Sequence, residues 1–478
     1  MQIRFSYAMI TPIIAYFFIL IRCLHSLFNN KNISRHAKKL LELSAIVVRV
    51  NLFCGADESL MSVFPKKFSQ ALNRVCQIGL FSLTLPMAVH AQSLPVIAQH
   101  PIENVIKNFE QPTTQQTQQK TKQNKSIAQM RIMHIDLDYV FDTDKAQQQR
   151  NIQALIQRIQ NIRPNTIFLQ AFADPDANGS ADQVYFENCY MPVRDNLFQQ
   201  VLQQIRQNTQ VQHVYAWLPV LAWELPKDQQ LNYVQHRQGG QKGYIRLSPF
   251  EQKNLDIIVD IYRDFIQHNP VDGVLYHDDV TLSDYEDSSA LAHKYYQQWG
   301  FSHRIFKDLR HPEQARLAKY KTAYLDQLAA GITQVLKQYQ PNLLVARNMY
   351  APVVTQPQSE QWFAQSMPST YRYYDYNAIM AMPYMEQSKD HKKFYLDLIQ
   401  HAKKYDPNLD RTIFELQTVN WRNQQKISTQ ELQHTIQLLE QHGVKHIGYY
   451  PDDFVAQHPQ VKPMQLSFQL DSEPDSAQ

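Results

Sequence analysis

A short apolar run near the middle of the chain is followed at once by a cluster of acidic residues. Residues 273–276 read Gly-Val-Leu-Tyr, which is typical of a short buried strand. The cluster that follows contains His277, Asp278, Asp279, Asp284, Glu286 and Asp287. Acid–base cleavage of a glycosidic bond needs two carboxyl groups that flank it, one protonated and one ionised. Because crowded acids push their pKa values apart, this cluster could supply both forms near neutral pH.

Two other roles compete with this interpretation. The triplet at 277–279 offers an imidazole nitrogen and carboxylate oxygens, which are ligands of divalent metals. The acids at 284–287 precede a predicted helix near Ser288 and could cap it. A metal is disfavoured because the strand ends supply no second histidine except His134, which falls in the middle of a strand. We therefore expect a glycosidase site without a metal or any other cofactor.

Eight predicted strands alternate with amphipathic segments after residue 130, and these elements would position the acids. The predicted strands are 131–137, 166–172, 213–219, 273–277, 343–347, 378–382, 412–416 and 447–450. The predicted helices include 145–162, 194–207, 249–268, 319–339 and 428–442. Strict alternation predicts an α/β fold of the TIM type, a (β/α)8 barrel. An open doubly wound sheet is the alternative, but the chain has no Gly-rich phosphate-binding motif, which disfavours nucleotide binding.

In such barrels the catalytic and binding groups lie on the loops after the strands. The residues that we expect to bind substrate stand at or after the predicted strand ends: His277, Asp136, Asp138, Trp223, Arg347, Tyr384, Glu415, Trp421, Tyr449 and Asp452. Four of them are aromatic and could stack on sugar rings: Trp223, Tyr384, Trp421 and Tyr449. The surplus of carboxylates would attract a cationic substrate, such as a polymer that bears free amines.

Structural alternatives exist for several of these residues. Asp136 and Asp138 could bond loop amides, and Arg347 could orient a carboxylate instead of binding substrate. A single tyrosine lies more often in a core than on a binding platform. The formal net charge is only +3, so nucleic acid is not an expected partner.

The first ninety residues are typical of export signals rather than of a folded domain. An apolar run at 8–21 is short for a membrane span. From Met61 onward the chain shows a basic start, an apolar stretch at 75–87 and a small-residue cleavage site at 89–91. We expect 1–60 to be an upstream extension that is not translated, and 61–91 to be a signal peptide. A membrane anchor at 8–21 is the alternative.

Residues 92–129 are polar and rich in glutamine, so we predict a disordered linker there, followed by the folded domain at 130–460 and a tail at 461–478. Three of the four cysteines lie before residue 92, and Cys189 would be left without a disulfide partner. Export and a linker together predict that the folded part acts outside the cytoplasm.

Eight motifs between residues 133 and 454 resemble, in order, the C-terminal glycoside hydrolase domain of the PgaB family. They are M-H-I-D-L-D-Y-V (133–140), R-L-S-P-F (246–250), V-D-G-V-L-Y-H-D-D-V-T-L-S-D-Y-E-D (271–287), A-R-N-M-Y (346–350), S-E-Q-W-F-A-Q (359–365), A-I-M-A-M-P-Y (378–384), F-E-L-Q (414–417) and G-Y-Y-P-D-D-F (448–454). The resemblance implies an endo-acting hydrolase that cleaves partially deacetylated poly-β-1,6-N-acetyl-D-glucosamine, a biofilm exopolysaccharide. It also implies a periplasmic or outer-membrane location in a Gram-negative bacterium, beside the polymer's export machinery.

The catalytic acids that the resemblance implies fall on Asp278, Asp279, Asp284 and Glu286. Which of them donates the proton, and whether the mechanism retains or inverts, stays open. PgaB proteins also have an N-terminal deacetylase domain with an Asp and a paired HxxxH, which is not found upstream of Met130, so no N-deacetylase activity is expected. A non-catalytic module that binds the polymer during export is the alternative function.

Overall fold

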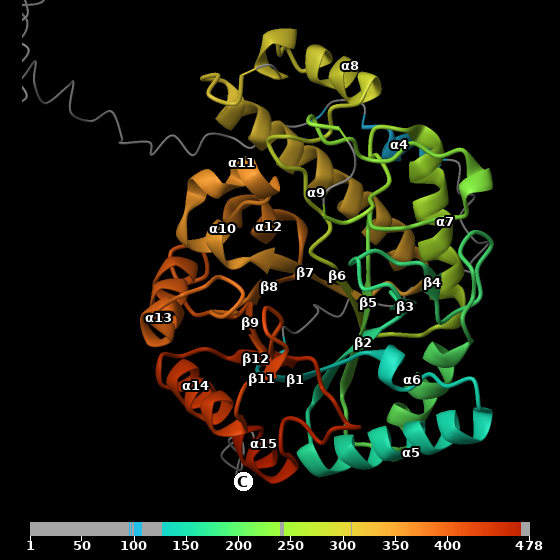
Figure 1. The fold of residues 1–478 in the computed structure, drawn as a ribbon, viewed down its shortest axis with the longest axis vertical. Helices are drawn as coiled ribbons and strands as arrows, with labels where there is room; N and C mark the ends of the chain where they lie inside the picture. Colours follow the sequence, from blue (N-terminus) through green and yellow to red (C-terminus); the bar gives the residue numbers. More distant parts are fainter. Residues whose placement is uncertain are drawn as a thin grey trace, which may run out of the picture. The chain divides into compact units, whose positions relative to one another are not determined.

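The computed structural model of the protein describes residues 95, 97, 100–107, 127–239, 243–306 and 308–469 (Figure 1). The chain divides into two units, Met1–Ser93 and Leu94–Gln478, and the first lies outside the described residues. The upstream extension and the signal peptide therefore stay predictions. Within the described part, no helix has enough consecutive apolar residues to cross a membrane.

Eight parallel strands close into a barrel, as the alternation of the sequence predicts. In chain order they are β1 (Met130–Ile135), β2 (Thr166–Gln170), β5 (His213–Leu218), β6 (Gly273–Tyr276), β7 (Leu344–Tyr350), β8 (Tyr376–Met380), β9 (Thr412–Gln417) and β12 (His446–Tyr450). Around the barrel their order is β1-β12-β9-β8-β7-β6-β5-β2, which returns to β1. The predicted (β/α)8 barrel is confirmed, and each predicted strand overlaps one strand of the barrel.

Most strand residues are buried because the barrel interior covers one face and helices cover the other. Every residue of β1, β2, β6, β8 and β9 is buried. The helices around the strands (Figure 1) are α5 (Lys145–Ile162), α6 (Leu197–Asn208), α7 (Gln252–His268), α8 (Ala290–Gln298), α9 (Gln314–Tyr339), α10 (Ala351–Thr355), α11 (Glu360–Phe363), α12 (Met367–Tyr373), α13 (His391–Ala402), α14 (Thr429–Gln441) and α15 (Val461–Ser467). The α5 bounds agree with the predicted helix, and the other predicted helices differ by a few residues at their ends.

Side-chain caps fix where several helices begin. Asp144, Ser289, Asp390 and Ser428 each accept a hydrogen bond from a backbone N–H in the first turn of the helix that follows. Two small antiparallel pairs lie in the loops after strands: β3 (Phe172–Ala173) with β4 (Gln183–Val184), and β10 (Val419–Asn420) with β11 (Gln425–Lys426). They order the segments that follow β2 and β9.

The range predicted as a disordered linker contains a short helix, α4 (Ile102–Lys107), which contacts α7 and α9. Ile97, Ile102 and Val105 are buried in the core. His100 is also buried; its Nε2 lies 3.1 Å from the carbonyl oxygen of Tyr324, and its Nδ1 accepts from the backbone N–H of Ile102. The prediction of disorder is therefore wrong for residues 100–107, because apolar residues at 97, 102 and 105 supply a buried face.

The range predicted as a tail, 461–478, begins with a helix, α15. Helix α15 contacts α5 and α14, and it buries Met464, with Phe468 just beyond its end. The folded region therefore extends past both predicted limits of 130 and 460.

Candidate active site

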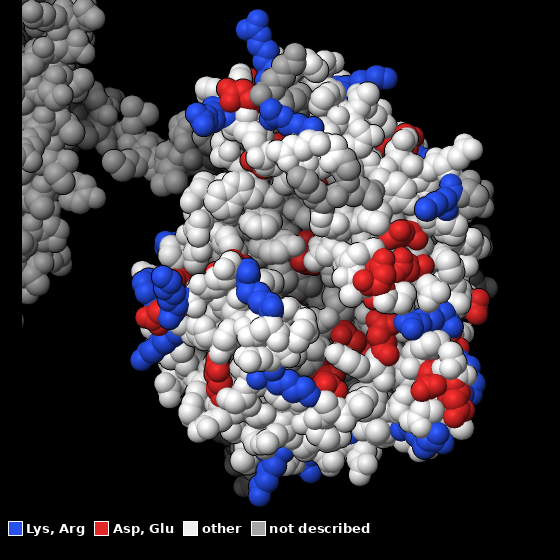
Figure 2. Space-filling view, viewed as in Figure 1, with Lys and Arg blue, Asp and Glu red and all other residues white. Residues whose placement is uncertain are grey.

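A cleft of about 570 Å³ opens where the strands of the barrel end. Every barrel strand contributes a residue to its lining, from within the strand or directly after it: His134, Gln170, Trp217, His277, Asn348, Met380, Glu415 and Tyr450. The other lining residues are Asp136, Asp138, Tyr139, Phe172, Asp174, Ala177, Gly179, Tyr244, Asp278, Met382, Met385 and Trp421. Figure 2 shows a hollow near the middle of this view, with acidic side chains in it and along one side. This is the position of active sites in (β/α)8 barrels.

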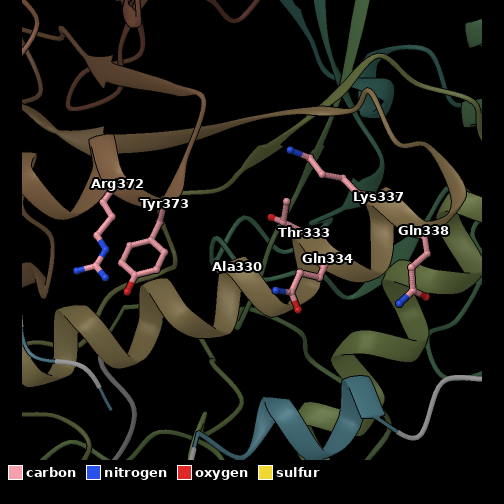
Figure 3. Close-up of a pocket in the computed structure, with 7 residues that line it drawn as sticks. All are labelled: Ala330, Thr333, Gln334, Lys337, Gln338, Arg372 and Tyr373. Carbon is pink, nitrogen blue, oxygen red and sulfur yellow. The ribbon is translucent and has the colours of Figure 1, made fainter. Parts of the chain in front are cut away.

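A second cavity, of about 480 Å³, lies between α9 and α12 on the helical layer (Figure 3). Its lining consists of Ala330, Thr333, Gln334, Lys337, Gln338, Arg372 and Tyr373. None of these lining residues is an acid, so this cavity cannot supply a pair of carboxyl groups. The cleft at the strand ends, which has several acids in its lining, is the candidate active site.

Asp278 and His277 form a close carboxyl–imidazole pair in the cleft. His277 Nδ1 lies 2.9 Å from Asp278 Oδ1, and Asp278 is only 7% exposed. Burial raises the pKa of Asp278, but the charge of His277 and several hydrogen bonds outweigh burial and hold that pKa below its usual value. Burial lowers the pKa of His277, but the charge of Asp278 raises it above its usual value. Each partner thus favours the charged form of the other.

Tyr244 reaches Asp278 from the loop between β5 and α7. Its hydroxyl donates to the Asp278 carboxylate at 3.0–3.1 Å. The Tyr244 ring lies against Gly179, where a Cβ would come within 2.0 Å of the ring, and Gly179 has a φ of +90°. Only glycine fits both the close approach and this backbone conformation. The loops after β2 and β5 therefore meet at the carboxylate that follows β6.

Asp136 lies in the same cleft but in the opposite protonation state. Burial, followed by the charge of Asp138, raises the pKa of Asp136 to about 8. A hydrogen bond from the hydroxyl of Tyr450, at 3.3 Å, favours ionisation but does not offset these effects. At neutral pH Asp136 is therefore mainly protonated, whereas Asp278 is ionised.

Glu415 is another acid in the cleft lining, which also includes Asp174. Its Oε1 lies 3.1 Å from His134 Nδ1, and its Oε2 accepts from the Asn348 side-chain amide. Asp138 is paired differently, because it accepts from Tyr185 at 2.6 Å and from Arg194 at 2.6 Å. Asp136 and Asp278 are thus the cleft acids with opposite protonation states, and Asp138 is neutralised by a cation.

Aromatic rings form a continuous floor in the cleft. Trp217 lies at its centre, with ring centroids 4.4 Å from His134, 4.9 Å from Phe172, 5.1 Å from His277 and 5.5 Å from Tyr450. Trp421 extends the floor, because its ring lies 6.0 Å from that of Tyr450 at an interplanar angle of 31°. Faces of aromatic rings are good surfaces for the apolar faces of sugars.

Three more carboxylates lie at the side of the cleft, on the loop between β3 and β4. Asp174, Asp176 and Asp182 each place an oxygen within 4.8 Å of the others, so they could hold a cation. Burial, followed by the charges of Asp176, Glu224 and Asp174, raises the pKa of Asp182 to about 6. Together they make this side of the cleft strongly negative.

The structure brings six of the predicted site residues together in the cleft: His277, Asp278, Asp136, Asp138, Glu415 and Trp421. Asp279 is not among them. It is fully buried, and its carboxylate accepts from the backbone N–H groups of Val220, Leu221 and Ala222 at 2.5–3.2 Å. Asp279 therefore anchors the loop after β5 instead of facing the cleft, contrary to the expected catalytic placement.

Asp284 and Glu286 also lie outside the cleft lining. Glu286 is buried in an ion pair with Arg246 at 2.7 Å and accepts from the Ser283 hydroxyl at 3.0 Å. Burial raises the pKa of Asp284, which lies near Lys321. Lys321 donates to the backbone oxygens of Ser283 and Glu286. The Glu286–Arg246 ion pair and the hydrogen bonds of Lys321 stabilise the conformation of the loop after β6.

Three predicted binding residues point toward the helices instead of into the cleft. Arg347 is fully buried against Asp326 at 2.6 Å. Asp452 is paired with Arg158 at 2.7 Å, and the hydroxyl of Tyr449 donates to Asp452 at 2.8 Å. All five side chains form buried pairs between strand ends and surrounding helices, so the expected binding role does not fit Arg347, Tyr449 or Asp452.

Trp223 and Tyr384 are likewise placed away from the cleft lining. Trp223 is fully buried, and its Nε1 donates to the carbonyl oxygen of Val220 at 3.0 Å. The hydroxyl of Tyr384 donates to Glu431 at 2.9 Å. Both aromatic residues follow predicted strand ends, as Trp421 does. Their contacts place them outside the cleft lining, so they are not available to stack on a sugar there.

The sequence interpretation missed Trp217, Tyr244, Tyr450 and the cleft position of His134. Alternation along a strand places Tyr449 and Tyr450 on opposite faces. The sequence does not determine which of the two faces the cleft, and the structure places Tyr450 there instead of the predicted Tyr449. Tyr244 lies on a long loop, and no local pattern marks it as a cleft residue.

Comparisons with known proteins agree with this site. Hypothetical glycosyl hydrolase family 13 matches residues 134–450, the range that contains every cleft residue named above. The PgaB (BpsB) glycoside hydrolase domain from Bordetella bronchiseptica is 38% identical, with a TM-score of 0.69 over 72% of this chain and 99% of that domain. An alpha-L-fucosidase, isoenzyme 2 from Paenibacillus thiaminolyticus, is 12% identical, with a TM-score of 0.50 over 71% of this chain and 48% of that one, and shows the fold alone.

A curated relative points the same way. The chain is 41% identical over 345 residues to the poly-beta-1,6-N-acetyl-D-glucosamine N-deacetylase of Escherichia coli (strain K12). The match covers 69% of this chain and 51% of the relative, so the chain spans about half the length of the curated relatives it matches. The chain belongs to hypothetical glycosyl hydrolase family 13, and its barrel is a glycoside hydrolase domain like that of PgaB.

Proposed function

We propose that the barrel is an endo-acting glycoside hydrolase that cleaves partially deacetylated poly-β-1,6-N-acetyl-D-glucosamine. One observation carries this proposal: the aromatic cleft holds a protonated acid, Asp136, and an ionised one, Asp278. Their strands, β1 and β6, are separated by β2 and β5 around the barrel, so the two groups approach the cleft from different sides. Glycoside hydrolysis requires two such groups on either side of the bond.

In the proposed mechanism Asp136 donates its proton to the oxygen of the leaving sugar. Asp278 acts on the other side, as the base that activates water or as the nucleophile that attacks the anomeric carbon. His277 and Tyr244 keep Asp278 ionised through charge and hydrogen bonding. The anomeric form of the first product, read by proton NMR, distinguishes the two routes.

The substrate follows from the relatives and from the charge of the cleft. The curated relatives are named for poly-beta-1,6-N-acetyl-D-glucosamine. Loss of acetyl groups leaves ammonium groups on that polymer, and the acids at 174, 176 and 182 would attract them. The floor from Phe172 to Trp421 suits a chain that lies across the cleft, which favours endo cleavage.

The place of action is part of the proposal. The signal peptide predicted at 61–91 favours export to the periplasm or the outer membrane, near the machinery that exports the polymer. N-terminal sequencing of the protein recovered from the periplasm should begin at Gln92. A mature protein that retains residues 8–21 would instead support a membrane anchor.

The decisive experiment incubates the purified protein with the partially deacetylated polymer and follows released oligosaccharides by mass spectrometry. Endo cleavage should give a ladder of oligomers, and the Asp278→Asn variant should give none. A wild-type protein that binds the polymer but releases no oligomers would overturn the hydrolase and support the binding module.

A further inference from the structure

A groove of about 680 Å³ lies between two helices on the outside of the barrel, α13 and α14. These helices follow β8 and β9, which are neighbours in the barrel (Figure 1). Helix α13 packs against α10 and α14 packs against α15, but α13 and α14 are not a closely packed pair. The groove between them is lined by His391, Lys392, Tyr395, Ser428, Gln430, Glu431, His434, Thr435, Gln437, Leu438 and Gln441. Its volume is in the range of ligand sites.

The wall that α14 contributes to this groove is polar and accessible to solvent. Its exposed residues recur at helical spacing and so form one stripe: Gln430, His434, Gln437 and Gln441. At 1.5 Å per residue the stripe is roughly 16 Å long, which is enough for more than one sugar unit. A carboxamide offers both donors and acceptors and can therefore pair with sugar hydroxyls. A groove that bound a protein would instead have an apolar centre.

The groove is connected to the cleft by the two loops that lie between them. The loop after β8 has Met385 in the cleft lining and reaches the groove at His391. The segment after β9 has Trp421 in the cleft lining and reaches the groove at Ser428. Arg422 links the two loops, because its Nη2 lies 3.5 Å from the carbonyl oxygen of Met385. A chain that leaves the cleft between Met385 and Trp421 would cross this link and enter the groove.

The groove differs from the cleft in charge. Its lining has one acid, Glu431, and one lysine, Lys392. The Glu431 carboxylate accepts from the hydroxyl of Tyr384 at 2.9 Å and lies 3.4 Å from His391 Nδ1. The cleft, in contrast, is strongly acidic on one side. The groove therefore suits hydroxyl and acetamido groups, and its binding should depend little on the amines of a sugar chain or on salt.

We propose that the groove between α13 and α14 is a second binding site for the polymer, which holds the part of the chain that leaves the cleft between Met385 and Trp421. This inference rests on the proposed function, because it takes the same amino-sugar polymer as the ligand. Chains that are held at both places bind more tightly than oligomers that fill the cleft alone. The groove would thus make the protein prefer long chains.

Oligomers of increasing length test this proposal. In the Asp278→Asn background, which leaves them uncut, calorimetry would measure affinity for partially deacetylated 1,6-linked glucosamine oligomers. The affinity of this parent should keep rising once the oligomers are long enough to leave the cleft. Gln437→Ala/Gln441→Ala should remove that rise and weaken binding of the long oligomers about tenfold, with a much smaller change for the shortest.

A matched control removes two exposed glutamines of the same spacing from another helix. Gln153 and Gln157 lie on α5, outside the linings of the cleft and the groove. Gln153→Ala/Gln157→Ala should leave the affinity unchanged at every length. Hydrogen exchange, read by mass spectrometry, locates the bound chain: long oligomers should slow exchange at 430–441, and the shortest should not.

Three outcomes would overturn the proposal. Equal affinity of the Gln437→Ala/Gln441→Ala variant and its parent at every length, with circular dichroism showing an intact fold, would show that the groove does not hold the chain. An equal loss for short and long oligomers would show that the change acts through the cleft. Slower exchange at 430–441 that grows with protein concentration, without oligomers, would assign the groove to a second copy of the chain.

These measurements use binding and not cleavage. Release of oligosaccharides by the wild-type protein is measured separately. A protein that binds long chains through the groove but cleaves none would refute the proposed hydrolase and leave this inference standing.

Discussion

Asp278 and Asp279 are neighbours in the chain, yet they lie in different chemical environments. Asp278 lines the cleft, where a histidine and a tyrosine hydroxyl surround its carboxylate. Asp279 points into the fold, where three consecutive backbone N–H groups, at 220–222, saturate its oxygens. The contrast teaches that the partners of a carboxylate decide its role, because a group whose lone pairs are filled by the backbone cannot exchange protons with substrate.

The largest expected effect of a substitution at either aspartate is on catalysis, at Asp278. Asp278→Asn should lower kcat about a thousandfold, because the amide can act neither as base nor as nucleophile. Its midpoint of thermal unfolding should stay close to that of the wild type, since the residue sits in a cleft. Oligosaccharide release and circular dichroism would measure the two properties. Wild-type turnover by Asp278→Asn would remove the residue from the reaction.

Asp279→Ala should show the reverse pattern. Three buried backbone N–H groups would lose their acceptor, so we expect the free energy of unfolding to fall by about 3–5 kcal/mol. Urea denaturation, followed by intrinsic tryptophan fluorescence, would measure this change. A fully stable Asp279→Ala protein that has lost all activity would contradict this structural role and would show that Asp279 takes part in catalysis.

Asp136 should set the alkaline limit of activity. Because its pKa in the folded protein is about 8, kcat/KM should fall as the pH rises through about 8 and the proton is lost. The same shift has a consequence for stability. A carboxyl whose pKa is raised on folding makes the folded state less stable as pH rises from about 4 to about 8.

Asp136→Asn therefore should be inactive but more stable than the wild type at pH 8, since the amide never ionises. Thermal unfolding at pH 5 and at pH 8 would test this, with the difference between the two proteins growing at the higher pH. A difference that is the same at both pH values would contradict the raised pKa of Asp136.

The smallest expected effect concerns the tyrosine that supports Asp278. Tyr244→Phe removes a hydroxyl that donates to the carboxylate, which raises the pKa of Asp278. The acid limb of the pH profile should move to higher pH, while the rate at neutral pH should change less than about threefold. An unshifted acid limb would show that the hydroxyl does not tune Asp278.

The fold could be predicted from sequence because alternation of apolar runs and helical periodicity is local. The cleft position of Asp278 could also be predicted, since this residue closely follows a short apolar strand. The burial of Asp279 could not be predicted, because its hydrogen-bond partners at 220–222 come from the loop after another strand. Arg347 illustrates the same limit, since its partner Asp326 lies on α9 and no local pattern shows that the two side chains face each other.

The short helix α4 moves the boundary of the folding unit. Its apolar residues cover part of α7 and α9, and His100 is joined to the backbone of α9. A truncated protein that starts at Met130 would leave that apolar surface open to water and to other molecules, which favours aggregation. The smallest piece expected to stay monomeric therefore begins near Leu94 and includes α4, instead of beginning at the first barrel strand.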